Sequence, residues 1–161
     1  MTTSIAEQTA VRAVSRYWED IAVGETSRSS ERVVTAEEMV EFAAKYDPQS
    51  FHVDRAAANK SLFGGLIGSG IYSAALWRIM DHEVNGNIAF VCGIAWDNVK
   101  WGNALRPGDT IYATSRCLTK RESKSRSGVG IITMHHEVIN QKDEAILAFD
   151  GVDLVYRKSK A

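Results

Sequence analysis

Hydrophobic residues recur at helical spacing in the segment 36–46. The segment is preceded by Thr35, and Glu38 follows three positions later, which together form the capping box of a helix start. Pro48 disfavours helical backbone at the residue before it. The pattern therefore predicts a helix over 36–46 that ends just before Asp47.

A second segment, from about 69 to 81, is apolar on nearly all sides, which is typical of a buried helix. After it the pattern changes to Val, Ile, Thr and aromatic residues, which favour strands. Short turns separate these strands, so we expect an antiparallel sheet that covers the apolar helix. The expected strands are a short one between 24 and 34, then 88–101, 110–122, 127–140 and 144–157.

Composition indicates one folded unit. The chain has 161 residues, of which 45% are hydrophobic and 24% charged, and it shows no internal repeat. Residues 1–16 are polar and rich in Ala and Thr, so we expect a flexible tail there and a single domain over 17–158.

The net charge of −1 argues against nucleic acid as the main partner, because phosphate binding needs a concentrated basic face. Arg121, Lys124 and Arg126 form only a small cluster, which we expect on a solvated hairpin tip. Contact with a phosphate-bearing ligand is the less favoured interpretation.

Three features favour a cytoplasmic protein. The N-terminal residues lack the apolar core of a secretory signal, and no segment is long enough to span a bilayer. Cys92 and Cys117 have no CxxC spacing, so we expect two reduced thiols in the core.

Candidate chemistry is concentrated between 46 and 70. Asp47 and His52, five residues apart, combine a carboxylate and an imidazole, the groups used in acid/base catalysis. A glycine-rich turn follows and leads into the apolar helix, whose first N–H groups suit a developing negative charge. We expect Gly70 to supply that N–H, with Ser69 and Gly65 beside the substrate.

Each of these signals also has an ordinary structural explanation. An Asp-Pro helix end with a histidine nearby is common in loops, and a glycine-rich turn more often serves packing. Ser69 is equally well explained as a helix N-cap. Only their joint occurrence favours an enzyme.

A metal site is not expected. His135 and His136 are adjacent on a predicted strand, so their rings should point to opposite faces of the sheet. His82 is expected at the end of the buried helix, and His52 with Asp54 lacks further ligands.

The segments 46–54, 62–70 and 106–109 resemble those of the MaoC-like dehydratases, relatives of the R-specific enoyl-CoA hydratases (hydratase 2). The resemblance covers nearly the whole ordered chain. It implies an α+β hotdog fold, in which an antiparallel sheet wraps around a long central helix. It also implies that Asp47 and His52 form the catalytic dyad.

The sequence departs from the hydratase 2 pattern Asp-x-Asn-Pro-Leu-His at two places. Pro48 follows the aspartate directly and Gln49 stands at the asparagine position, where we expect a substrate contact. Ser69 precedes Gly70 where many members have histidine. Both changes resemble a glutamine-containing subgroup of MaoC-like proteins.

The resemblance implies a hydro-lyase that interconverts (R)-3-hydroxyacyl and trans-2-enoyl thioesters. Coenzyme A or acyl carrier protein would carry the acyl group, and no metal or redox cofactor is implied. The family implies a homodimer or higher homo-oligomer. Two alternatives remain: a hotdog thioesterase, and a non-catalytic subunit that binds acyl thioesters.

Overall fold

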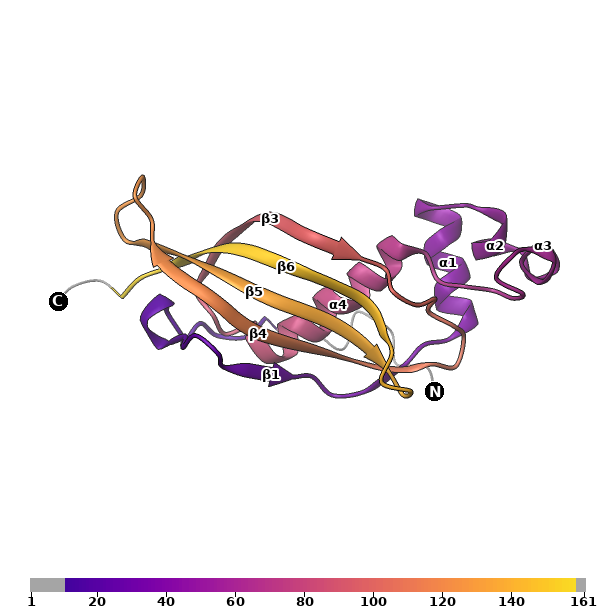
Figure 1. The fold of residues 1–161 in the computed structure, drawn as a ribbon, viewed down its shortest axis with the longest axis horizontal. Coiled ribbons are helices and arrows are strands. Elements are labelled where there is room, and N and C mark those ends of the chain that lie inside the picture. Colours follow the sequence, from indigo (N-terminus) through magenta and orange to yellow (C-terminus); the bar gives the residue numbers. More distant parts are fainter. Residues whose placement is uncertain (1–10, 159–161) are drawn as a thin grey trace.

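The computed structural model describes residues 11–158, which form one curved antiparallel sheet, one long helix and a group of short helices (Figure 1). The strand order is β1-β4-β5-β6-β3, and β2 also pairs with β4. The strands are β1 (Thr26–Arg28), β2 (Arg32–Val33), β3 (Phe90–Lys100), β4 (Thr110–Glu122), β5 (Val129–Asn140) and β6 (Ala145–Tyr156).

The short α-helices gather at one end of the sheet, the long helix runs along its inner face, and a 3₁₀ turn lies toward the other end (Figure 1). No helix in the part of the chain that the structure describes combines the length and apolar character needed to cross a bilayer. The helices are the 3₁₀ turn η2 (Trp18–Asp20), α1 (Ala36–Tyr46), α2 (Ser50–Val53), α3 (Arg55–Lys60) and α4 (Gly70–Asn85).

Local sequence signals explain α1. The Thr35 side chain accepts a hydrogen bond from the Glu38 N–H at 3.2 Å, as the capping box predicts. At the other end Asp47 leaves the helical region, with φ −156° and ψ 67°. The expected helix 36–46 is confirmed, and Asp47 is its C-cap.

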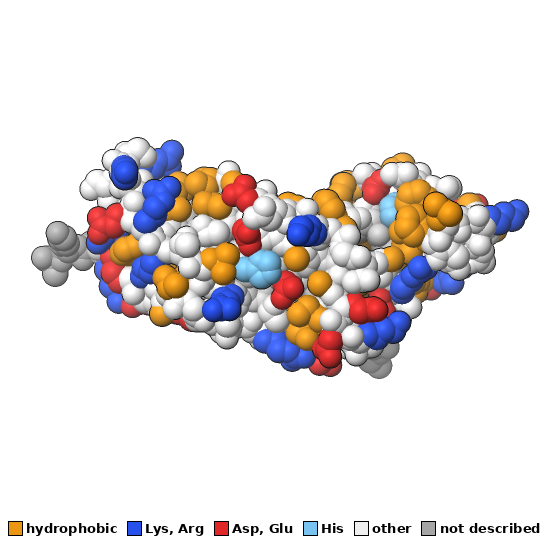
Figure 2. All heavy atoms as spheres, in the orientation of Figure 1, with side chains coloured by type: hydrophobic (Ala, Val, Ile, Leu, Met, Phe, Trp, Pro, Cys, Tyr) orange, Lys and Arg blue, Asp and Glu red, His pale blue; other side chains and the backbone are white. Residues whose placement is uncertain are grey.

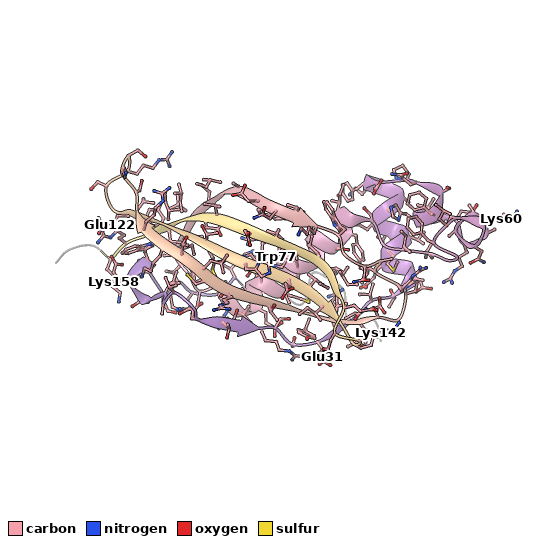
Figure 3. The ribbon with its side chains drawn as sticks, viewed as in Figure 1. Glu31, Lys60, Trp77, Glu122, Lys142 and Lys158 are labelled. Atoms are coloured by element: carbon pink, nitrogen blue, oxygen red, sulfur yellow. The ribbon has the colours of Figure 1, made fainter. Side chains whose placement is uncertain are left out.

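The helix α4 packs one face against the sheet. Leu76, Trp77 and Met80 on that face are at most 4% exposed and form the core with side chains of β4, β5 and β6. Trp77 is labelled in Figure 3, where it lies between α4 and the sheet. The opposite face remains open in this single chain, since Ile71 is 56% exposed. The helix is therefore less enclosed than its apolar composition predicts.

One expectation about side chains in this part of the chain is wrong. Cys117 is buried, but Cys92 is exposed because it lies on β3, an edge strand of the sheet. His82 lies in the last turn of α4, near the helix end as expected, although the helix continues to Asn85, beyond the expected end at about 81. Burial is the main cause that lowers the pKa of His82, and the neighbouring Arg78 adds to it.

The predicted turns are present. Gly108 has φ +87° and the Asp109 N–H donates to the Arg106 carbonyl at 3.1 Å, which defines a type II turn. In the basic cluster, Lys124 and Arg126 lie in the link between β4 and β5, and Arg121 lies at the adjoining end of β4. The predicted tail, 1–16, lies largely outside the described residues; within its described part, the Ser15 and Arg16 N–H groups donate to the Asn87 carbonyl at 2.9 and 3.1 Å.

A buried polar network joins α4 to the sheet. Asp81 accepts a hydrogen bond from Asn85 at 2.8 Å and another from Arg78 at 3.2 Å. His136 on β5 has its Nδ1 atom 3.9 Å from Asp81, and burial lowers the pKa of His136 to about 4. Burial, with Asp81 nearby, raises the pKa of Asp153 on β6 to about 6. The core therefore contains a carboxyl group that resists ionisation.

The raised pKa of Asp153 predicts a specific pH dependence of stability. The folded chain holds the proton up to about pH 6, whereas the unfolded chain loses it near the ordinary value of 3.8. The contribution of Asp153 to the free energy of unfolding should therefore fall as pH rises between these values and stay lower above them. The lowered pKa of His136 contributes in the opposite sense, because the unfolded chain binds a proton at this histidine up to the ordinary value of 6.5. Asp153→Asn should remove this penalty and raise the free energy of unfolding at pH 7.5 by about 1–3 kcal/mol.

Denaturant unfolding of the wild type and of Asp153→Asn at pH 4 and pH 7.5 isolates the contribution of Asp153, because His136 is common to both proteins. Asp150→Asn is the control on the same strand, because hydrogen bonds from Asn98 and His135 lower the pKa of Asp150 and the replacement should not stabilise the protein. An Asp153→Asn protein no more stable than the wild type at pH 7.5 would contradict the expected penalty.

Candidate active site

Asp47 and His52 lie together at the junction of α1, α2 and α4. Asp47 follows the last residue of α1, and its carbonyl accepts a hydrogen bond from the Gln49 N–H at 2.8 Å. The chain then turns into α2, which carries His52 one turn further on. The His52 Nε2 and Asp47 Oδ2 atoms are 3.5 Å apart. The spacing of the two residues in the sequence thus becomes a close approach of their reactive atoms.

The protonation of His52 follows from its second partner. Its Nδ1 atom lies 2.8 Å from the Ile67 carbonyl oxygen. A carbonyl oxygen can only accept, so Nδ1 must carry the hydrogen. In the neutral imidazole the other nitrogen, Nε2, then has a free lone pair, and it faces the Asp47 carboxylate. His52 is 6% exposed, and this burial holds the ring in one orientation.

Ser69 joins the dyad to the long helix. Its hydroxyl donates to Asp47 Oδ2 at 2.7 Å and accepts from the Ile71 N–H at 3.2 Å. The two interpretations of Ser69 from the sequence are therefore compatible, because one hydroxyl serves as the N-cap of α4 and as a contact to Asp47. The serine is completely buried, and the start of α4 is fixed relative to the carboxylate.

Gly70 begins α4, and its N–H has no hydrogen-bond partner within the described residues. The Gly70 carbonyl accepts a hydrogen bond from Trp101 Nε1 at 3.1 Å. A Cβ atom at this position would lie only 2.8 Å from Trp101 Nε1, so the packing requires glycine. The unpaired N–H and the positive end of the helix dipole lie next to Ser69, close to the dyad.

The remaining predicted site residues are placed differently. Gln49 is the N-cap of α2, and its exposed side chain forms no capping hydrogen bond. Gly65 packs against Arg106, whose Nη1 atom would lie 3.4 Å from an added Cβ. The structure thus brings Asp47, His52, Ser69 and Gly70 together and leaves Gly65 at the guanidinium of Arg106.

Sequence reasoning missed two partners of the site. The Ile67 carbonyl orients His52, and Trp101 covers the first turn of α4. A main-chain carbonyl leaves no signal in residue types, and Trp101 lies 31 positions from the glycine it contacts.

A second aspartate and histidine pair lies on the outer face of the sheet. His135 Nδ1 is 2.7 Å from Asp150 Oδ1, while His136 packs against Trp77 and Phe149 on the inner face. The two adjacent histidines therefore face opposite sides, as predicted. No group of three or more metal-binding side chains is found among residues 11–158.

The surface near the dyad is apolar. Tyr46 is 57% exposed, Leu62 is fully exposed and Phe63 is 42% exposed. Figure 2 shows hydrophobic side chains gathered over the end of the molecule formed by α1, α2 and α3, with a hollow between this end and the sheet. An apolar rim around a polar pair is typical of a site for a small organic substrate.

Solved structures share this architecture. A MaoC-like dehydratase from Rhodospirillum rubrum is 32% identical, with a TM-score of 0.82 over 91% of this chain and 100% of its own. The (R)-hydratase from A. caviae involved in PHA biosynthesis is 21% identical, with a TM-score of 0.67 over 86% of this chain and 98% of its own. At that identity the second likeness establishes the hotdog fold alone.

The sequence also matches known proteins and a known domain. An uncharacterized protein of Bacillus subtilis (strain 168), YdeM, is 25% identical over 134 residues, which cover 83% of this chain and 92% of YdeM. Residues 20–139 match the MaoC like domain, from η2 through nearly all of β5. The chain therefore belongs to the MaoC-like dehydratase family of hotdog proteins.

Proposed function

We propose that this protein is a hydro-lyase that interconverts trans-2-enoyl and (R)-3-hydroxyacyl thioesters. The observation that carries the proposal is the pairing of the Asp47 carboxylate with the His52 Nε2 lone pair at 3.5 Å. This distance is too long for a strong direct hydrogen bond. It leaves both acceptors directed at one place, where a water molecule can donate a hydrogen to each.

Hydration begins with that water. Its oxygen bonds to the β-carbon of the enoyl group while the dyad removes one of its protons. The electron pair of the carbon–carbon double bond moves toward the thioester, and negative charge develops on the carbonyl oxygen. The dyad then returns the proton to the α-carbon, so the reaction consumes one water and needs no other reactant. Dehydration is the reverse sequence.

The charge on the thioester oxygen needs a donor, and the Gly70 N–H is the proposed one. It is unpaired within the described part of the chain and lies at the positive end of α4. Because Ser69 connects this helix end to Asp47, the donor and the dyad are held in one frame. Such preorganised donors typically contribute about 10²–10³ in rate.

The proposal also covers the acyl carrier, the oligomeric state and the cellular location. Coenzyme A or acyl carrier protein would carry the acyl group, and no other cofactor is needed for the steps above. A homodimer is proposed because the edge strand β3 exposes Ile94 and Trp96, 53% and 46%, and α4 exposes Ile71. The proposed location is cytoplasmic.

The direct test mixes the purified protein with crotonyl-CoA and follows enoyl-thioester absorbance and free thiol together. Loss of absorbance without thiol release is the expected result. Thiol release would identify a thioesterase instead. No turnover over a range of enoyl chain lengths, with binding retained, would identify a non-catalytic subunit, and either outcome refutes the proposal.

The dyad makes a prediction of its own. Asp47→Asn and His52→Ala should each lower kcat by about 10²–10⁴-fold, because each removes one acceptor of the water's protons. Both proteins should remain folded by circular dichroism. Asp150→Asn and His135→Ala provide a matched control, since they disrupt the other aspartate and histidine pair on the outer face and should keep the wild-type rate. A dyad variant with a near-normal kcat would refute the assignment.

A further inference from the structure

The loop 61–69, between α3 and α4, carries the atoms that orient the dyad but has no regular secondary structure. The Ile67 carbonyl in this loop fixes the proton of His52, and Ser69 ends it. In the second half of the loop, two main-chain hydrogen bonds reach other segments: the Ile67 N–H donates to the Phe51 carbonyl at 3.4 Å and the Gly68 N–H to the Leu105 carbonyl at 2.8 Å. In the first half, the Gly64 N–H donates to the Ser61 carbonyl within the loop at 3.1 Å. The position of the Ile67 carbonyl therefore depends on what else holds the loop.

Arg106 holds it from the side. Its Nη2 atom donates to the Phe63 carbonyl at 2.7 Å, and its Nη1 atom approaches the Leu66 carbonyl at 3.5 Å. Gly65 lies between these two residues in the sequence, and an added Cβ there would be in contact with Nη1 at 3.4 Å. The planar fork thus spans the segment just before Ile67.

Arg106 itself stands on a rigid base. Its N–H donates to Asp109 Oδ2 at 2.7 Å, and Asp109 Oδ1 accepts from Gln141 at 3.0 Å. The Asp109 carbonyl accepts from the Val34 N–H at 2.9 Å. The type II turn is therefore tied to β2 and to the hairpin between β5 and β6, and Arg106 transmits that rigidity to the loop.

The charge of Arg106 is not used in an ion pair within the described residues. The guanidinium is always ionised, and its hydrogen bonds within residues 11–158 all go to neutral carbonyls of the loop. Hydrogen bonds from a charged donor are about twice as strong as neutral ones. These hydrogen bonds from the half-buried Arg106 guanidinium hold the loop in one place.

We propose that Arg106 is a positioning residue of the active site, which clamps the loop so that the Ile67 carbonyl keeps the proton of His52 on Nδ1. The expected effect of Arg106 on the rate of hydration rests on the proposed function. Its expected effect on the tautomer of His52 does not. Gly65, which we expect from the sequence to lie beside the substrate, is also next to this guanidinium. Without the clamp, the ring can take either neutral tautomer and Nε2 no longer always faces Asp47 with a free lone pair.

The first test is spectroscopic and needs no activity. Protein labelled with ¹⁵N-histidine reports the tautomer of each of the four histidines in two-bond ¹H–¹⁵N correlation spectra, and His52→Ala identifies the signal of His52. The wild type should show His52 with its hydrogen on Nδ1. Arg106→Gln should show a mixture of tautomers or a lost Nδ1–H signal, with the other histidines unchanged.

The second test is kinetic. Arg106→Gln should lower kcat for enoyl-thioester hydration by about 10–100-fold with KM nearly unchanged, because the water and not the acyl carrier is misplaced. The limbs of its pH–rate profile should move. Arg106→Lys keeps the charge but loses the fork, so it should fall between the glutamine variant and the wild type. Arg121→Gln, at the remote hairpin tip, removes the same charge and should behave as wild type.

A conservative variant guards against a folding defect. Arg106→Lys keeps the positive charge but loses the planar fork, so it should show the tautomer change in weaker form. A folded Arg106→Gln protein with the wild-type tautomer and pH–rate profile would overturn the proposal. If the wild type hydrates no enoyl thioester, the proposed function fails, but the spectra still decide the role of Arg106.

Discussion

The hydrogen bond between the Ile67 carbonyl and His52 Nδ1 is the interaction on which the site depends. At 2.8 Å it leaves only one assignment of the imidazole proton, because the carbonyl cannot donate. In the neutral imidazole, Nε2 then keeps its lone pair, and it faces the Asp47 carboxylate. A rotation of the ring or a shift of the loop would turn two converging acceptors into an ordinary buried histidine and a surface carboxylate.

The fold places the N-terminus of α4 next to Asp47 and His52. The sheet buries one face of α4 through Leu76, Trp77 and Met80, which sets the helix axis. Ser69 then caps the helix and bonds to Asp47 with the same hydroxyl. A capping interaction of about 1 kcal/mol is thus also a geometric link between the N-terminal dipole of α4 and the acid/base pair.

The sequence predicted what depends on local patterns. Thr35 and Pro48 bracket α1 correctly, and the strand boundaries agree within a few residues because Val, Ile and Thr alternate with turn residues. It failed where distant segments meet. The contacts of Gly65 with Arg106 and of Trp101 with Gly70 join residues 41 and 31 positions apart. The exposure of Cys92 follows from the edge position of β3, and strand order cannot be read from hydrophobic periodicity.

The stereochemistry of hydration in deuterium oxide tests the central claim most directly. If Asp47 and His52 share one water, the hydroxyl group and the α-deuteron must reach the same face of the double bond. Proton NMR of the 2-deuterio-3-hydroxybutyryl product from crotonyl-CoA should then show a single diastereomer that corresponds to syn addition. Anti addition, or a mixture of diastereomers formed by the enzyme, would contradict a single dyad that performs both proton transfers.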